Sequence, residues 1–541
     1  MIIGIDFDNT IARYDFLFQE VALKEKLLGV DFIGSGKTEI RNYLRRQPDG
    51  EKIWMRLQGM VYGKYMSGAE FMPGAANFLL SCNRRKHQVF IVSHKTEYGH
   101  FDPEKISLRS EALKWMDAKR FFDPAFFGLG RENIFFADTR EKKVDIIACL
   151  KCEWFIDDLP EVFEEKHFPV LSNKILFGSY KPEQCQDRIV LNSWRKIHGE
   201  IHGQIGDTDI AFWASCMVNG PIERVEKILG QGNSTVHKIY VSGKKSYGLK
   251  HYPDQLMDTR PRLKTEFLAL EVLHKHHIKN VPMPIQKNHD LNLGLYEWID
   301  GEKITAPKVD DLLQVINFVE NLFTISRESN NNQIGAASEA CLSADELMNQ
   351  IDRRFNKLQE VGGNYQELSL FLEEDFEPLW SEVRNGTIPL WPEESLYTKL
   401  PRHKRVLSPS DFGFHNSLMT IDGSLTFIDF DYFGWDDPVK LTADFIWHPA
   451  MNLDGELIEK WKIAMLELFS DDEHFEKRLN AAMPLYGLRW AMIILNEYLP
   501  EIAQKRKNAS GFKQYDLKKS QEVQLNKARH YRELVKTYSP N

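Results

Sequence analysis

The sequence predicts two α/β regions in tandem. The first is a parallel sheet with crossover helices, and the second opens with strands and ends with helices. In the first 170 residues, short β-branched or aromatic runs alternate with helical stretches, which is typical of a Rossmann-like parallel sheet. Beyond residue 222 the strands come first, and after Pro307 the helical pattern dominates. A chain of 541 residues with 43% hydrophobic side chains can bury the large cores that this arrangement needs.

The first region has a regular order of elements. Strands are expected over 2–7, 88–92, 133–136 and 153–156, and helices over 74–84 and 143–150. Residues 12–72 are too long for one crossover between parallel strands, so they must hold an inserted element. We expect a small cap, about residues 14–70, above a site at the sheet edge of a domain that covers residues 1–175.

The second region begins after a Gly- and Asp-rich stretch at 198–209, which is typical of a junction. We expect residues 176–221 to connect the regions and residues 222–541 to form the second domain. Its small lobe would cover about 222–302 and its helical lobe about 303–541. Strands are expected near 226–229, 236–241, 247–251 and 293–298, with a helix over 263–275.

Charge and cysteine content exclude several classes of protein. Lys plus Arg total 69 against 78 for Asp plus Glu, so the net charge of -9 lacks the basic excess of a nucleic-acid binder. Six scattered cysteines are too few for a disulfide framework in a chain of this length, which favours a reducing compartment. No window reaches the ~18 apolar residues of a membrane helix, and the start lacks the basic segment of a signal peptide. We expect a cytoplasmic protein with small-molecule partners, no nucleic acid and no membrane insertion; the sequence leaves its oligomeric state open.

Two carboxylates follow the first predicted strand. Asp6 and Asp8 emerge at its carboxyl end, where ligands of parallel sheets bind, and alternating side-chain direction would send both the same way. Paired carboxylates can share nucleophilic and acid–base roles or hold a hard cation. The plain alternative is a strand-end turn without chemistry.

Three further pieces follow later elements. Ser93 comes after the second strand and offers a hydroxyl for a phosphoryl oxygen. A lysine at the start of the next helix, Lys142 or Lys143, could neutralise phosphate charge, and spacing does not choose between them. The last strand ends in Asp157 and Asp158, two oxygen ligands for Mg²⁺.

In order and setting, these four pieces resemble the haloacid dehalogenase superfamily of phosphohydrolases over about 170 residues. The resemblance implies that Asp6 attacks phosphorus to form an aspartyl-phosphate, and that Asp8 protonates the leaving group and then activates water. Mg²⁺ would be held by Asp6, the backbone carbonyl of Asp8, Asp157 and Asp158. The phosphoryl group would be bound by Thr10, Ser93 and Lys143.

A second set of residues opens the second region. Gly230 and Gly232 lie between two predicted strands, where backbone N–H groups can approach phosphates closely, although a turn alone explains most such pairs. Lys250 lies in a predicted strand and Glu266 on the helix that follows. An ion pair between them could fix the lysine against nucleotide phosphates.

The stronger signal is the segment 408–416, which a strand at 425–428 follows. Four residues separate Asp411 from Asn416, and Asp429 comes directly after the strand. Such an arrangement supplies a base for a hydroxyl and two oxygen ligands for Mg²⁺.

Together with Glu297 in a hinge-like segment at 296–301, residues 222 to about 500 resemble the aminoglycoside phosphotransferase and choline kinase family. The resemblance implies a two-lobed protein-kinase-like fold, ATP as phosphoryl donor and Asp411 as catalytic base. It also implies a nucleotide site at Gly230, Gly232, Lys250, Glu266 and Glu297, with Mg²⁺ on Asn416 and Asp429. One departure is Pro409, where the family usually has a histidine.

The two regions together predict a bifunctional enzyme. One half would phosphorylate a hydroxyl of a small metabolite with ATP, and the other would hydrolyse a phosphomonoester with Mg²⁺. Acting in sequence on a sugar or sugar phosphate, they would relocate a phosphate between hydroxyls. Three alternatives stay open: an active half regulated by a retired half that binds a phosphorylated ligand, a choline or amino-alcohol kinase, or a protein kinase that acts on a Ser or Thr side chain. The sequence does not name the acceptor.

Overall fold

The computed structural model describes the chain apart from residues 30, 31, 35, 103, 181–186, 229–233, 257, 329–332, 452, 504–515 and 539–541. The chain forms two compact units. The first comprises Met1–Ile228, Val236–Thr259 and Gln286–Leu293, and the second comprises Leu229–Thr235, Arg260–Ile285 and Gly294–Asn541. Among the described residues, no helix combines the length and the apolar character that crossing a membrane requires.

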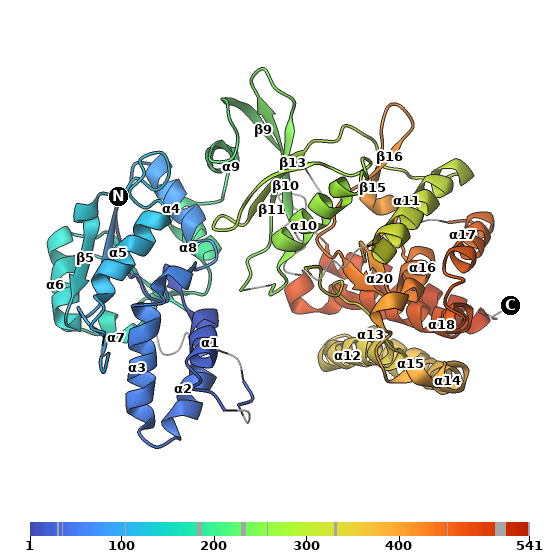
Figure 1. Ribbon diagram of the computed structural model, residues 1–541, viewed down its shortest axis with the longest axis horizontal. Coiled ribbons are helices and arrows are strands. Elements are labelled where there is room, and N and C mark those ends of the chain that lie inside the picture. Colours follow the sequence, from blue (N-terminus) through green and yellow to red (C-terminus); the bar gives the residue numbers. More distant parts are fainter. Residues whose placement is uncertain are drawn as a thin grey trace. The chain divides into compact units, whose positions relative to one another are not determined.

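A six-stranded, fully parallel sheet forms the centre of the first unit, in the order β5-β4-β1-β6-β7-β8 (Figure 1). Its strands are β1 (Ile2–Ile5), β4 (Gln88–His94), β5 (Ile134–Ala137), β6 (Trp154–Asp157), β7 (Asn173–Phe177) and β8 (Ile189–Leu191). Ile5 pairs with Ile91 on one side and Ile156 on the other, so β1, β4 and β6 end at the same edge. The first four strands were expected within a residue or two. The last two were not, because the segment that contains them has no regular pattern in the sequence.

Helices carry the crossovers of this sheet. They are α4 (Ala75–Arg84), α5 (Leu108–Ala118), α6 (Arg140–Leu150) and α7 (Pro160–Phe163), and two further helices, α8 (Trp194–His202) and α9 (Asp207–Ser215), follow the last strand. Helix α6 buries Val144 and Ile147 in a core with Phe155 of β6. It begins after Thr139, whose hydroxyl accepts the N–H of Lys142 at 3.2 Å. This N-cap starts the helix at Arg140, and Lys143, Val144 and Ile147 are its buried residues.

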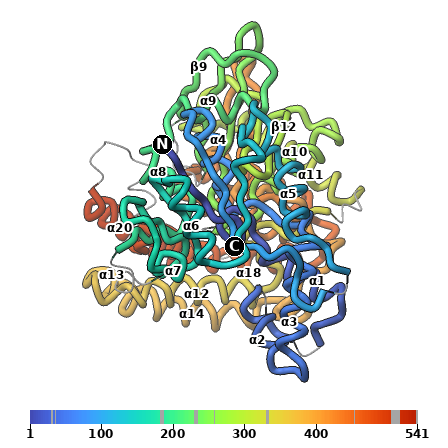
Figure 2. The backbone as a smooth tube through the Cα atoms, turned by 90° about the vertical axis from the view of Figure 1, so that its left-hand side faces the viewer, coloured from blue at the N-terminus to red at the C-terminus, as the bar shows by residue number. Residues whose placement is uncertain are grey.

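Three helices fill the segment predicted to hold an inserted element. They are α1 (Asp15–Lys24), α2 (Lys37–Arg45) and α3 (Gly50–Tyr62), and they stay together in both views (Figures 1 and 2). Phe18 of α1 stacks on Trp54 of α3 at 5.3 Å between ring centroids. The insertion is bounded by two short antiparallel strands, β2 (Ala12–Arg13) and β3 (Glu70–Phe71). It therefore leaves and re-enters the domain at neighbouring points.

A five-stranded sheet has the order β12-β13-β11-β10-β9. Its strands are β9 (Ile222–Ile228), β10 (Thr235–Val241), β11 (Tyr247–His251), β12 (Pro284–Asn288) and β13 (Leu293–Glu297). Strands β9 and β10 pair antiparallel, with an irregularity between Tyr240 and Val241. The predicted helix at 263–275 is α10 (Arg262–Lys275). Strand β9 begins four residues before its predicted start, and β12 was not expected.

Helices make up most of the second unit. After α10 they are α11 (Val309–Glu328), α12 (Ala344–Gly362), α13 (Gln366–Leu370), α14 (Glu377–Thr387), α15 (Glu393–Leu396), α16 (Pro438–Trp447), α17 (Gly455–Leu468), α18 (Phe475–Ile494) and α20 (Leu517–Thr537). Two short antiparallel pairs join them: β14 (Val406–Ser408) with β17 (Gly434–Asp436), and β15 (Ser417–Met419) with β16 (Leu425–Phe427). Phe318 of α11, Phe445 of α16 and Leu488 of α18 share one buried core. This core supports the loop that follows β14.

Candidate active sites

The first site lies at the carboxyl edge of the parallel sheet. Asp6 directly follows β1, Asp157 ends β6, and Ser93 lies near the end of β4. The N–H of Asp6 donates to the carbonyl of Ile156 at 2.9 Å, so the sheet register continues up to the two carboxylates. Both carboxylates are buried. The topology alone thus brings together side chains that are far apart in the sequence.

Lys143 of α6 joins these two carboxylates. Its ammonium group donates to Asp6 at 2.5 Å and to Asp157 at 2.6 Å, and only 1% of its side chain is exposed. Lys142 is exposed and lies 3.6 Å from Asp138. Of the two lysines that the sequence left open, the structure places Lys143 with the carboxylates. Burial opposes its charge, but Asp157 and Asp6 outweigh burial and raise the pKa of Lys143.

The carboxylates of this site outnumber their ammonium partner. Asp6, Asp157 and Asp158 each offer an oxygen within 4.8 Å of the others. Burial raises the pKa of Asp6 well above its ordinary value, although Lys143 opposes the shift. Burial and the charge of Asp157 raise the pKa of Asp158 to about 7. A divalent cation on these oxygens would stabilise the ionised form of both carboxylates. The donor set therefore fits Mg²⁺.

Two hydroxyls that the resemblance assigns to phosphate binding are buried. The hydroxyl of Thr10 donates to Asp158 at 3.4 Å. Ser93 is 1% exposed, and its hydroxyl oxygen has no hydrogen-bond partner in the part of the chain that the structure describes. A buried hydroxyl without a partner is costly unless a ligand satisfies it. A phosphoryl oxygen is a suitable ligand of this kind.

Asp8 is held by two side chains that were not among the predicted site residues. The hydroxyl of Tyr14 donates to Asp8 at 2.5 Å, and the ammonium group of Lys95 lies 2.9 Å from it. Lys95 stands two residues after Ser93, and alternate residues of a strand point the same way, so this spacing could have suggested it. Tyr14 belongs to the start of the insertion and has no comparable signal. Both partners orient the Asp8 carboxylate.

Lys37 adds a cation from the insertion. It was not among the predicted site residues. It begins α2, and its ammonium group donates to the hydroxyl of Tyr62 at 2.9 Å. Burial lowers its pKa, while the charges of Asp158 and Asp8 oppose that shift. The cap therefore brings positive charge toward the carboxylates.

The second site is the loop that follows β14. Ser410 has a φ of 68°, a left-handed conformation that is uncommon for a residue with a side chain. The N–H of Asp411 donates to the carbonyl of Pro409 at 2.9 Å. The side-chain amide of Asn416 donates to the carbonyl of Asp411, also at 2.9 Å. The predicted base and a predicted metal ligand are thus tied to each other within one loop.

Two histidines act on the Asp411 carboxylate, and neither was expected to. Nε2 of His415 lies 3.0 Å from Oδ1 and Nε2 of His448 lies 3.6 Å from it, with the two rings stacked at 3.8 Å. The N–H of Ala450 donates to Nδ1 of His448 at 3.2 Å, which assigns the proton of that neutral ring to Nε2. Burial opposes ionisation of Asp411, but the hydrogen bond and charge of His415 outweigh it and lower its pKa to about 2. Burial and His415 lower the pKa of His448 to about 4.

A carboxylate cluster follows β16. Glu266, Asp429 and Asp431 each offer an oxygen within 4.8 Å of the others, and Arg262 pairs with Asp431 at 2.6 Å. The N–H of Ile428 donates to the backbone carbonyl of Asn416 at 2.9 Å, which sets the predicted ligands Asn416 and Asp429 on neighbouring stretches of chain. Because the Asn416 amide nitrogen is used on Asp411, its side-chain oxygen is the atom suited to a metal. These oxygen donors fit Mg²⁺.

The other predicted nucleotide-binding residues are placed in part. Lys250 is buried on β11, with its ammonium group 5.1 Å from the ring centre of Tyr252. Glu297 ends β13, where its carboxylate accepts the N–H of Met283 at 3.4 Å. Gly230 and Gly232 lie outside the described residues. The ion pair of Lys250 with Glu266 stays a prediction.

Comparison with known families decides the class of the second site. Residues 225–474 match the phosphotransferase enzyme family. This region is a kinase-like phosphotransferase domain. The match includes the loop with Asp411 and Asn416 and the cluster with Asp429. It does not include the first site, so the phosphohydrolase resemblance stays a prediction.

Several solved structures resemble this chain weakly. A choline kinase from Cryptosporidium parvum Iowa II is 12% identical and matches 61% of this chain and 96% of its own, with a TM-score of 0.41. An ethanolamine kinase from Plasmodium vivax is 16% identical and matches 65% of this chain and 94% of its own, with a TM-score of 0.41. A choline kinase from Streptococcus pneumoniae is 14% identical and matches 61% of this chain and 99% of its own, with a TM-score of 0.39. The comparison with curated proteins found no match.

Proposed function

We propose that the phosphotransferase domain transfers the γ-phosphoryl group of ATP to a hydroxyl of a small metabolite, with Asp411 as the base. The loop that ties Asp411 to Asn416 carries this proposal, because it lies within the family match. Both imidazoles act on Oδ1 of Asp411. Among the described residues, this leaves Oδ2 to accept the proton of the acceptor hydroxyl. His415 and His448 keep the carboxylate oriented and ionised.

Mg²⁺ would be held by Asn416 and Asp429, and would neutralise charge on the phosphates of ATP. Support comes from the oxygen donors of Glu266, Asp429 and Asp431, which lie within 4.8 Å of one another. Gly230, Gly232, Lys250, Glu266 and Glu297 would bind or orient the nucleotide.

We further propose that the first site hydrolyses a phosphomonoester. The supporting observation is Lys143, bonded to Asp6 and Asp157 at the sheet edge. An oxygen of Asp6 would attack phosphorus, and the ester oxygen would leave with a proton from Asp8. Asp8 would then take a proton from the water that attacks the aspartyl-phosphate, which releases phosphate and restores Asp6. Lys95 orients Asp8 for both proton transfers.

The two activities would act on different hydroxyls, because opposed reactions on one hydroxyl would only consume ATP. A sugar phosphate would gain a phosphoryl group at a second hydroxyl and then lose the first. The result would be a relocated phosphate. A retired regulatory half and a choline or amino-alcohol kinase are the alternatives to this relay.

The experiment uses the Asp6→Asn variant, which cannot form the aspartyl-phosphate. This variant therefore cannot hydrolyse the product that the kinase site makes. It is incubated with ATP and Mg²⁺ against sugar phosphates, free sugars, polyols, choline and amino alcohols, and products are identified by mass spectrometry. We expect a sugar bisphosphate to accumulate, and the wild type to yield an isomeric monophosphate. The Asp6→Asn/Asp411→Asn double variant is the control and should form no product.

Other outcomes separate the alternatives. If only choline or ethanolamine gains a phosphoryl group, the domain is an amino-alcohol kinase. If no compound gains phosphate while the wild type hydrolyses phosphomonoesters, the kinase proposal fails and the regulatory alternative replaces it.

A further inference from the structure

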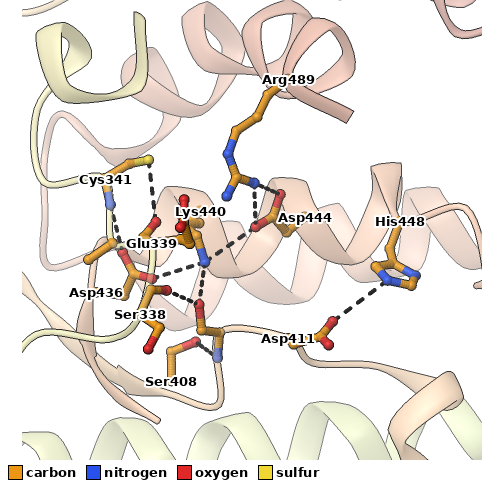
Figure 3. Close-up of polar contacts among 12 residues, drawn as sticks. Ser338, Glu339, Cys341, Ser408, Asp411, Asp436, Lys440, Asp444, His448 and Arg489 are labelled. Atoms are coloured by element: carbon orange, nitrogen blue, oxygen red, sulfur yellow. Dashed lines mark hydrogen bonds and ion pairs between the residues drawn. The ribbon is translucent and has the colours of Figure 1, made fainter. Parts of the chain in front are cut away.

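Helix α16 reaches the loop of Asp411 through one buried lysine. The Lys440 side chain is 2% exposed, and its ammonium group donates to the hydroxyl oxygen of Ser410 at 2.7 Å. It also lies 3.1 Å from Asp436 and 3.3 Å from Asp444, and Figure 3 shows it between these two carboxylates. Lys440 therefore links two buried carboxylates to the residue that directly precedes Asp411.

Ser410 needs such contacts because its backbone is in a sparsely populated conformation. Its φ of 68° is held by its own N–H, which donates to the Ser408 hydroxyl at 3.0 Å, and by its hydroxyl, which donates to the Ser338 carbonyl at 2.8 Å. A hydroxyl has one hydrogen, so its oxygen remains an acceptor for Lys440. Conformations of this kind persist only where the surroundings impose them.

The contact belongs to one face of α16. Lys440 and Asp444 lie four residues apart on the helix, and His448 caps its C-terminal end four residues later, so the three follow one another along this side. Asp444 is fixed in turn by Arg489 at 3.1 Å and by the indole N–H of Trp490 at 2.9 Å. From this side, Lys440 acts on Ser410 and His448 acts on Asp411. Burial opposes the charge of Lys440, but Asp436 and Asp444 outweigh burial and raise its pKa.

We propose that Lys440 is a positioning residue: it holds Ser410 in its left-handed conformation and thereby aims the Asp411 carboxylate at the phosphoryl acceptor. The inference rests on the proposed role of Asp411 as the base. Lys440 acts through Ser410 and is not itself expected to touch a substrate.

The test measures phosphate release from ATP and Mg²⁺ with water as the acceptor. In Lys440→Met, kcat should fall about 100-fold while KM for ATP stays within about 2-fold, because misorientation of a reacting group affects the chemical step. In Ser410→Ala, which removes the shared hydroxyl, kcat should fall about 10-fold. In Lys440→Arg, which keeps a donor, kcat should stay within about 10-fold of the wild-type value. In the Lys440→Met/Ser410→Ala double variant, kcat should fall no further than in Lys440→Met, because both residues act through one contact.

Arg478→Met is the matched control for lost stability. Arg478 is also a buried cation between two carboxylates, Asp437 at 2.9 Å and Asp472 at 2.6 Å, but it does not bond to the loop. We expect this variant to lower Tm as Lys440→Met does, with kcat of the folded protein within about 2-fold of wild type. If Lys440→Met behaves in the same way, the positioning role is wrong.

Asp411→Asn, measured in the same assay, separates the two proposals. If it retains turnover, the assignment of the base fails. If it loses turnover while Lys440→Met keeps the wild-type kcat, only the positioning role fails.

A crystal structure of Lys440→Met gives a readout that does not depend on turnover. The expected result is Ser410 outside the left-handed region and a displaced Asp411 carboxylate. An unchanged loop at 408–416 would overturn the proposal, even if the wild type hydrolyses no ATP without an acceptor.

Discussion

Each unit buries one lysine between two aspartates, but the two lysines stand at different distances from the proposed chemistry. Lys143 bonds directly to Asp6, the proposed nucleophile. Lys440 bonds to Ser410, one residue away from the proposed base. In both cases burial opposes the charge and the carboxylates outweigh burial. The same buried ion group can thus serve within a site or behind it, according to whether one of its carboxylates reacts.

The largest effect is expected where the lysine touches the reacting group. Lys143→Met should lower hydrolysis of p-nitrophenyl phosphate by about 1000-fold, because it removes both the partner of Asp6 and a cation for the phosphoryl oxygens. Steady-state kinetics measure this loss. Lys142→Met is the matched control, since Lys142 is exposed, and it should remain close to wild type. Equal losses in the two variants would contradict the assignment of Lys143.

A smaller effect is expected where a lysine only orients a reacting group of the same site. Lys95→Met should slow hydrolysis of an alkyl phosphate by about 10- to 100-fold, because Asp8 would no longer be aimed at the leaving oxygen. The loss of kcat/KM on p-nitrophenyl phosphate should be much smaller, since kcat/KM reports the first step and p-nitrophenolate leaves in that step without a proton. Comparing kcat/KM for the two substrates checks the prediction. A similar loss on both would mean that Lys95 does not act through Asp8.

The two aspartate pairs should also differ in their response to metal. Mg²⁺ at about ten times its Kd should stabilise the first unit by about 1.4 kcal/mol, or a rise in Tm of about 3–6 °C. Scanning calorimetry with Mg²⁺ and with EDTA measures this. The rise should vanish in Asp157→Asn and persist in Asp436→Asn, whose carboxylate pairs with Lys440. A rise that survives in Asp157→Asn would place the metal elsewhere.

The smallest effect concerns acid. Burial lowers the pKa of His202 to about 3, and its ring stacks on Phe78 at 4.8 Å in the first unit. Below pH about 6.5 the His202 imidazole binds a proton in the unfolded chain but stays neutral in the folded chain. His202 therefore lowers the free energy of unfolding as the pH falls from about 6.5 toward 3. The urea midpoint of His202→Phe should therefore drop less between pH 7 and pH 5 than that of wild type. His403→Gln, at an exposed position of the second unit, should follow the wild type.

Much of the first site could be predicted because its geometry follows from topology. Short apolar strands that each end in Asp or Ser imply a common edge, and the register of β1 with β4 and β6 produces that edge. The choice of Lys143 over Lys142 depends on which face of α6 is buried, and Lys143, Val144 and Ile147 lie on that face. Strands β7 and β8 escaped prediction because tertiary pairing, rather than a local pattern, makes them strands.

The contacts that orient the proposed acid and base could not be predicted. Tyr14 reaches Asp8 from the insertion, and Lys440 of α16 and His448 at its C-terminal end reach the loop of Asp411. Each depends on how an element packs against another, which the pattern of one segment does not encode. In the sequence, a lysine inside a helix is most often a solvated charge.

The pairing of Ala12 with Phe71 makes the helices of the cap exchangeable as a block. Both ends of the insertion leave one short ribbon, so a foreign segment grafted between Arg13 and Glu70 would meet the same attachment points and leave the register of the parallel sheet intact. A graft that keeps Tyr14 would also keep the partner of Asp8. If the first site hydrolyses a phosphomonoester as proposed, selectivity and chemistry would be inherited separately: the sheet edge would determine which bond breaks, and the transplanted block would determine which molecule is admitted.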